Sequence, residues 1–150
     1  MRKVLFFGII LIAMAAGGQG KASKFDGTWN TAMTCDAKGG TLGYTWHFLS
    51  TVTGGVLHGE RGTKGQQAYL AIDGKIANDG KAKLTASGIT AGAQYTHGPI
   101  KTEGEDYSYE VKAQFTATEG KGERSTGLGI VGRPCHFTFE KRAAAGTPNQ

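Results

Sequence analysis

The sequence predicts an all-β domain, most simply an antiparallel up-and-down β-barrel of about eight strands closed by a disulfide. From Phe25 onward, apolar residues recur with a period of two, which is the period of a strand with one buried and one exposed face. Turn residues recur about every eight to twelve positions, as in sandwiches and barrels. Two cysteines, Cys35 and Cys135, lie near the two ends of this region. A β-sandwich is the alternative architecture.

The chain begins with the pattern of a cleavable export signal. Arg2 and Lys3 form a basic start, residues 4–16 are an apolar run with one glycine, and small residues follow as far as Ala22. This order of parts is typical of a signal peptide, and the apolar run is too short to span a bilayer as a helix. We therefore expect residues 1–22 to be a signal peptide and the mature protein to be periplasmic or secreted.

About 130 residues remain after such a signal, which is enough for one domain with one core. We expect the barrel over residues 23–142 and a disordered tail over 143–150. Without Arg2 and Lys3, 15 of the 17 basic residues remain, compared with 12 acidic residues. This small excess does not indicate a nucleic-acid partner, and no second apolar stretch predicts a membrane span. The oligomeric state is left open.

The first and last predicted strands carry the cysteines. In residues 25–35, an apolar face that includes Trp29 and Cys35 alternates with a polar face. In the last strand Cys135 lies on the apolar face, and Pro134 before it lacks an amide hydrogen and should open that strand. A Cys35–Cys135 disulfide requires these strands to be neighbours, which closes the sheet. In the chain-entropy model such a long loop is worth roughly 4 to 5 kcal/mol.

Further strands are expected between these two. They lie near 42–50, Val56–Arg61, 67–76, 81–88, 107–117 and 121–130, with another candidate at 93–97. Turns are expected at Gly54-Gly55, at Asn78-Asp79-Gly80 and at Glu119-Gly120.

The sequence shows no local catalytic or cofactor motif. Residues 127–132 match G-x-G-x-x-G, but a strand follows where a dinucleotide-binding helix would be needed. The four histidines are scattered singly at His47, His58, His97 and His136, without the spacing of metal ligands. Neither a G-x-S-x-G elbow nor paired carboxylates are present. We expect a non-enzymatic protein without a cofactor or metal.

Aromatic residues with polar edges provide the candidate binding site. Tyr44, Trp46 and Phe48 follow one strand at period two, and Tyr69, Tyr95, Tyr107 and Tyr109 add further rings. In a small barrel such rings either fill the core or line a pocket at the open end. We expect Tyr44, Trp46, Tyr107 and Tyr109 to stack on a small, partly apolar ligand. Arg133 or His58 would supply a polar anchor, whereas Trp29, Phe137 and Phe139 would be structural.

A second hypothesis is a protein-interaction module, such as a secreted enzyme inhibitor. It would act through loops near residues 38–40, 61–66 and 96–106. This hypothesis predicts a filled barrel with exposed apolar loop tips, whereas ligand binding predicts an interior cavity.

Several segments carry a resemblance to known proteins. The segments 25–29, Leu70–Ile76, 84–88 and 132–139 resemble those of small, uncharacterised exported proteins of rhizobium-type bacteria. More distantly, Gly27-Thr28-Trp29 resembles the G-x-W start of the calycin barrels, the lipocalins and avidins. In lipocalin-like barrels that tryptophan packs at the closed end under a basic residue from the last strand. The resemblance thus implies this role for Arg133 or Lys141, and a barrel plugged at one end.

Overall fold

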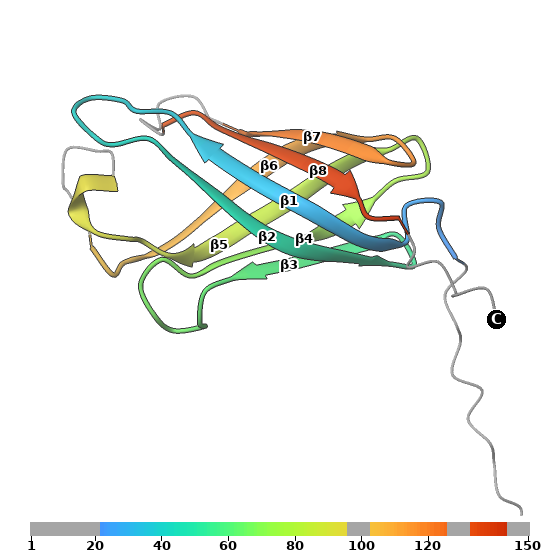
Figure 1. Cartoon of the computed structure of the whole chain (residues 1–150), viewed down its shortest axis with the longest axis horizontal. Coiled ribbons are helices and arrows are strands. Elements are labelled where there is room, and N and C mark those ends of the chain that lie inside the picture. The colour runs from blue at the N-terminus through green and yellow to red at the C-terminus, as the bar shows by residue number, and fades with distance from the viewer. Residues whose placement is uncertain (1–21, 96–102, 126–132, 144–150) are drawn as a thin grey trace, which may run out of the picture.

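The protein is a closed eight-stranded antiparallel barrel in which every strand pairs with its neighbours in the chain (Figure 1). The computed structural model describes residues 22–95, 103–125 and 133–143. The strands are β1 (Gly27–Cys35), β2 (Tyr44–Thr53), β3 (Val56–Arg61), β4 (Leu70–Ile76), β5 (Lys81–Ile89), β6 (Asp106–Phe115), β7 (Glu119–Arg124) and β8 (Cys135–Lys141). The predicted fold class is therefore confirmed. No helix in these ranges is long and apolar enough to cross a membrane.

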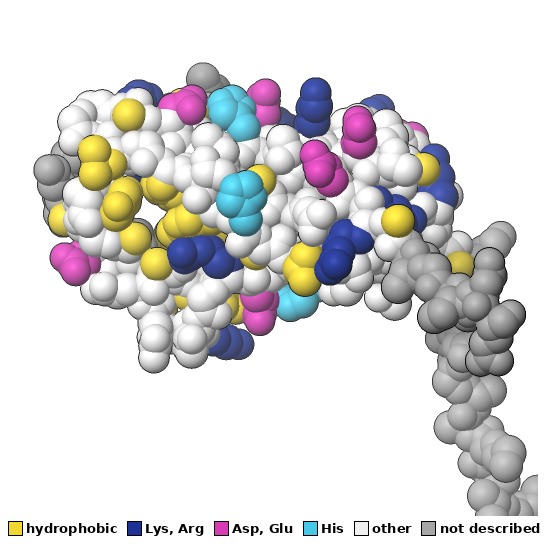
Figure 2. Space-filling model, in the orientation of Figure 1, with side chains coloured by type: hydrophobic (Ala, Val, Ile, Leu, Met, Phe, Trp, Pro, Cys, Tyr) yellow, Lys and Arg dark blue, Asp and Glu magenta, His cyan; other side chains and the backbone are white. Residues whose placement is uncertain are grey.

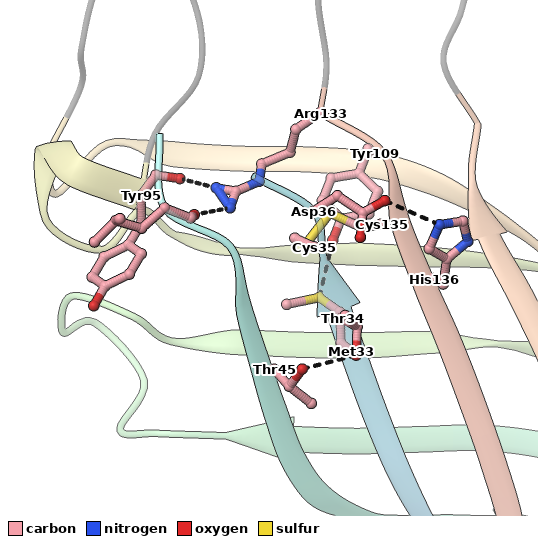
Figure 3. The surroundings of a disulfide bond; sticks show 11 residues. Met33, Thr34, Cys35, Asp36, Thr45, Tyr95, Tyr109, Arg133, Cys135 and His136 are labelled. Carbon is pink, nitrogen blue, oxygen red and sulfur yellow. Dashed lines mark hydrogen bonds and ion pairs between the residues drawn. A yellow bond between two sulfur atoms is a disulfide. The ribbon is translucent and has the colours of Figure 1, made fainter. Parts of the chain in front are cut away.

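A disulfide between Cys35 and Cys135 joins the strands that close the barrel. The ladder between β1 and β8 runs from Trp29 opposite Lys141 to Cys35 opposite Cys135, so the disulfide lies at one end of the seam (Figure 3). Pro134 directly precedes β8, and its carbonyl accepts a hydrogen bond from the amide of Asp36 at 3.1 Å. The predicted disulfide and the place of the proline are confirmed.

The end of the barrel where the chain enters is filled with apolar side chains. The Trp29 indole donates a hydrogen bond to the Phe25 carbonyl at 2.9 Å, and its ring packs edge-on against Phe115. Lys141 places its ammonium 5.8 Å from the centre of the Trp29 ring. The fully buried large side chains here and along the interior include Phe25, Trp29, Met33, Leu57, Leu70, Ile72, Leu84, Val111, Phe137 and Phe139.

A carboxylate fastens the entering segment over this closed end. Asp26 accepts a hydrogen bond from the Ser23 amide at 3.0 Å and another from the Gly55 amide at 2.9 Å. These bonds lower the pKa of Asp26 below its usual value, because they favour the ionised form. The segment is thereby tied to the hairpin between β2 and β3, and the closed end is covered.

Two predicted local structures are wrong. The candidate strand at 93–97 begins as a 3₁₀ turn over Ala93–Tyr95, with residues 96–97 outside the described ranges. Since β5 pairs directly with β6, the barrel has no place for a further strand there. Glu119 and Gly120 are not a turn but the start of β7, because Gly120 pairs with Phe115 of β6 and with Phe139 of β8. The turn precedes them, with Thr116 accepting a hydrogen bond from the Glu119 amide.

Other strand limits shift by a few residues. The strand expected from residue 67 begins at Leu70, since Ala68 adopts a positive φ of 63° before it. The strand expected over 121–130 runs over Glu119–Arg124. Several predicted features lie outside the described ranges. They are residues 126–130, the G-x-G-x-x-G match at 127–132, His97, residues 1–21 of the expected signal and residues 144–150 of the expected tail.

Candidate ligand-binding site

The two ends of the barrel differ in the length of their connections. At the closed end the hairpin between β2 and β3 turns at Gly54 and Gly55, and the other connections there are also short. At the opposite end, on the left of Figure 1, β1, β3, β5 and β7 end and long segments lead to the next strand. Binding residues are often placed on long loops that a rigid scaffold positions. We call this end the mouth.

Aromatic side chains line the interior at the mouth. Tyr44 and Trp46 of β2 point inward with their ring centres 4.7 Å apart, and Tyr107 and Tyr109 of β6 stack at 5.8 Å. These rings are only partly buried, whereas inward residues nearer the closed end, such as Val111, are fully buried. The packed core therefore stops below the mouth.

The strand pairing between β2 and β3 ends before it reaches these rings. The ladder between β2 and β3 joins only Ser50–Thr53 to Val56–Gly59, so residues 44–49 have no strand partner on that side within the described ranges. Figure 2 shows a hollow on the left of the molecule, with hydrophobic side chains at its edge and Lys or Arg side chains beside them. The hollow lies at the same end of the barrel as these partly buried rings.

Three arginines complete the mouth. Arg61 ends β3 and lies opposite the buried Leu70, and Arg124 ends β7 and lies opposite the buried Val111. Paired residues share one face of a sheet, so both point inward. Arg133 precedes β8 and is only 4% exposed.

Each guanidinium lies over one of the aromatic rings. The Cζ of Arg61 lies 4.1 Å from the ring centre of Trp46. The Cζ of Arg124 lies 4.3 Å from that of Tyr109, and the Cζ of Arg133 lies 4.7 Å from that of Tyr44. These are cation–π distances. The mouth is therefore a cationic and aromatic surface.

The arginines differ in their hydrogen bonds. Arg133 donates to the Tyr95 carbonyl at 2.7 Å and to the Leu42 carbonyl at 2.5 Å, so it ties two loops to the start of β8 (Figure 3). Its buried Nε finds no hydrogen-bond partner in the part of the chain that the structure describes. Arg61 donates to the Ala68 carbonyl at 2.8 Å.

Among the described residues, no carboxylate forms an ion pair with an arginine of the mouth. The Arg124 side chain has no hydrogen bond there either, and Arg133 has Asp36 as an electrostatic neighbour, which partly offsets the lowering of its pKa by burial. The neighbouring acids Glu60 and Glu123 occupy the alternate, outward positions of β3 and β7. Glu60 accepts a hydrogen bond from the Tyr69 hydroxyl at 2.6 Å.

The tyrosines of the mouth are neutral near pH 7. Burial raises the pKa of Tyr44, Tyr107 and Tyr109 above the ordinary value of 10.0. The positive charges of Arg61 and Arg124 act in the opposite direction on the pKa of both Tyr44 and Tyr107. Burial also lowers the pKa of Arg133, but a guanidinium stays protonated in proteins. The mouth therefore carries net positive charge.

The structure brings together five of the six residues predicted to bind a ligand. Tyr44, Trp46, Tyr107, Tyr109 and Arg133 meet at the mouth.

His58 does not join them. It lies on the outer face of β3, opposite Asp73, with its Nδ1 2.6 Å from an Asp73 carboxylate oxygen. The expectation that His58 anchors a ligand in the barrel is corrected, because it alternates with the inward-facing Leu57 and Gly59. Within the described ranges, no three His, Cys, Asp or Glu side chains lie close enough to hold a metal ion.

Two arginines of the mouth were missed by the sequence interpretation. Arg61 has the same phase as the inward Leu57 and Gly59 of β3, and Arg124 has the phase of Gly120 and Gly122. The period-two pattern was thus the available signal for both. No protein-family model matches the chain, and no curated protein or solved structure matches it significantly. The geometry of the mouth therefore carries the functional argument.

Proposed function

We propose that this protein is an exported, non-catalytic barrel that binds a small, partly apolar ligand in its mouth. The observation that carries the proposal is the division of the interior. Apolar side chains fill the closed end, whereas the aromatic rings of the mouth are only partly buried, and a hollow lies at that end of the molecule (Figure 2).

The hydrophobic effect provides the driving force for such binding. Each Å² of apolar surface removed from water contributes about 25 cal/mol, and the rings of Tyr44, Trp46, Tyr107 and Tyr109 are only partly covered by the protein itself. A planar apolar group placed on them would bury ring faces on both partners. Aromatic walls with a few polar groups are typical of small-ligand pockets.

Two features support export. The N-terminal residues have the order of parts of a signal peptide. The Cys35–Cys135 disulfide is of a kind that persists in oxidising compartments such as the bacterial periplasm or the exterior.

Calorimetric titration with 2-naphthamide, a neutral bicyclic aromatic probe, tests the proposal. We expect wild-type protein to bind the probe, and Trp46→Ala to weaken binding about tenfold or more through the loss of stacking area. The matched control is Leu49→Ala, because Leu49 lies on the same strand but faces outward and is 52% exposed. It should leave the affinity unchanged. Absence of binding by the wild type, or equal effects of the two substitutions, would contradict binding in the mouth.

A further inference from the structure

We propose that the ligand of the mouth is an aromatic anion, such as an aromatic carboxylate, held between Arg61 and Arg124. This inference rests on the proposed function and specifies its ligand. It follows from the number, positions and partners of the guanidinium groups.

The arginines of the mouth form no ion pair with a carboxylate of the described residues. Arg61, Arg124 and Arg133 converge on one end of the interior, and the acids next to them in sequence, Glu60 and Glu123, face outward. Positive charge held partly away from water is costly unless an opposite charge and hydrogen bonds offset it. An anionic ligand would supply both.

Two of the three guanidiniums have a terminal nitrogen without an acceptor among the described residues. A guanidinium carries five N–H donors. Arg61 uses one of its groups on the Ala68 carbonyl, and Arg124 has no acceptor within the described ranges. Arg133 is held by two loop carbonyls and so acts mainly as a fixed positive charge. Arg61 and Arg124 are therefore the groups that can bind a ligand directly.

The positions of these two guanidiniums are also restricted. Arg61 lies over the Trp46 ring and Arg124 over the Tyr109 ring, so each charge is held beside an aromatic side chain of the mouth. A guanidinium binds a carboxylate through two parallel hydrogen bonds. A ligand ring placed on these side chains would therefore bring an attached carboxylate close to a guanidinium.

Both arginines lie beside the rings on which such a ligand would stack. Arg61 is over Trp46 and Arg124 is over Tyr109, and both positive charges counteract the rise in pKa that burial causes for Tyr44 and for Tyr107. An anion that carries an aromatic ring can use the rings and the charges together, whereas an aliphatic anion lacks the stacking surface.

A matched pair of probes tests the inference by titration calorimetry. 2-Naphthoate is anionic at pH 7, and 2-naphthamide has nearly the same shape without the charge. We expect wild-type protein to bind naphthoate at least tenfold more tightly than naphthamide. Arg61→Gln and Arg124→Gln should each weaken naphthoate binding about tenfold or more, as expected for a charge-assisted hydrogen bond, and change naphthamide binding less than twofold.

The control variant is Lys112→Gln, which removes one positive charge from the outer face of β6. It should leave both affinities unchanged, so that a general effect of net charge is recognised. Arg124→Gln is the more secure variant because the Arg124 side chain makes no hydrogen bond to the described residues that its loss could disrupt. A thermal melt within a few degrees of wild type would show that the variant is folded.

The outcomes separate the two proposals. Equal affinity for the two probes, or arginine variants that behave like Lys112→Gln, would overturn the anion inference while the apolar site stands. Failure of both probes to bind would overturn the proposed function together with this inference.

Discussion

Replacing both cysteines should lower the free energy of unfolding of the barrel by about 4 to 5 kcal/mol. The change is Cys35→Ala with Cys135→Ala. Alanine is the better replacement than serine because the two side chains are only 1% and 3% exposed. A serine hydroxyl buried without a partner would add a cost of about 1–3 kcal/mol that has nothing to do with the cross-link.

The magnitude follows from the length of the closed loop. The cysteines are 100 residues apart in sequence. In the chain-entropy model, a loop of this length restricts the unfolded chain by about 4.7 kcal/mol at 25 °C. For a domain of this size each kcal/mol shifts the melting temperature by roughly 4 °C, so the variant should melt about 15–20 °C lower.

Urea unfolding followed by circular dichroism provides the assay. The slope of the free energy with urea should rise in the variant, because its unfolded chain is less compact and exposes more surface. Wild-type protein reduced with dithiothreitol is the control, and it should match the variant within about 1 kcal/mol. A loss below about 1 kcal/mol in both samples would refute the reasoning, since the cross-link would then not limit the unfolded state.

Two further predictions concern the core and the mouth. Gly120→Ala should destabilise the fold by about 1–3 kcal/mol through overpacking, because the new β-carbon would lie 2.5 Å from the Phe115 ring; unchanged urea unfolding would show that the ring can move aside. The change in absorbance at 295 nm between pH 9 and 11, which measures tyrosine ionisation, should be smaller than the change expected for five free tyrosines. Four tyrosines have a pKa raised above 10.0 in the folded protein, to about 12 for Tyr69. The unfolded chain therefore loses these protons at a lower pH than the folded protein does. The stability that these tyrosines contribute is complete below pH 10 and is lost as the pH rises through the folded-state pKa values. The full amplitude in folded protein at pH 11 would contradict this.

Sequence periodicity predicted the barrel because each strand has one dry face and one wet face. The alternation along residues 25–35 placed Trp29 and Cys35 on the dry face, and the structure has both buried. The same pattern placed Cys135 inward on the last strand, which made the disulfide and the closed seam predictable. A disulfide requires its two strands to lie close together, and the β1–β8 ladder shows that here they are paired neighbours.

The incorrect local predictions have a tertiary cause. Glu119-Gly120 has the composition of a turn, but Gly120 is required inside the barrel because the Phe115 ring occupies the space of a β-carbon. The segment at 93–97 contains a tyrosine and small residues like those of a strand, but the direct pairing of β5 with β6 leaves it no partner. In both places strand pairing and side-chain packing in the barrel override the local preference.

The sequence by itself determined the strand pattern, the disulfide and the aromatic residues of the mouth, because side-chain alternation and cysteine placement are local properties. Only the tertiary structure decided which polar residues join those rings. His58 and Arg61 are three residues apart on one strand and therefore face opposite sides of the wall, and Arg61, Arg124 and Arg133 come from three separate segments. Their convergence depends on strand register and barrel closure, which bring together residues that no local pattern relates.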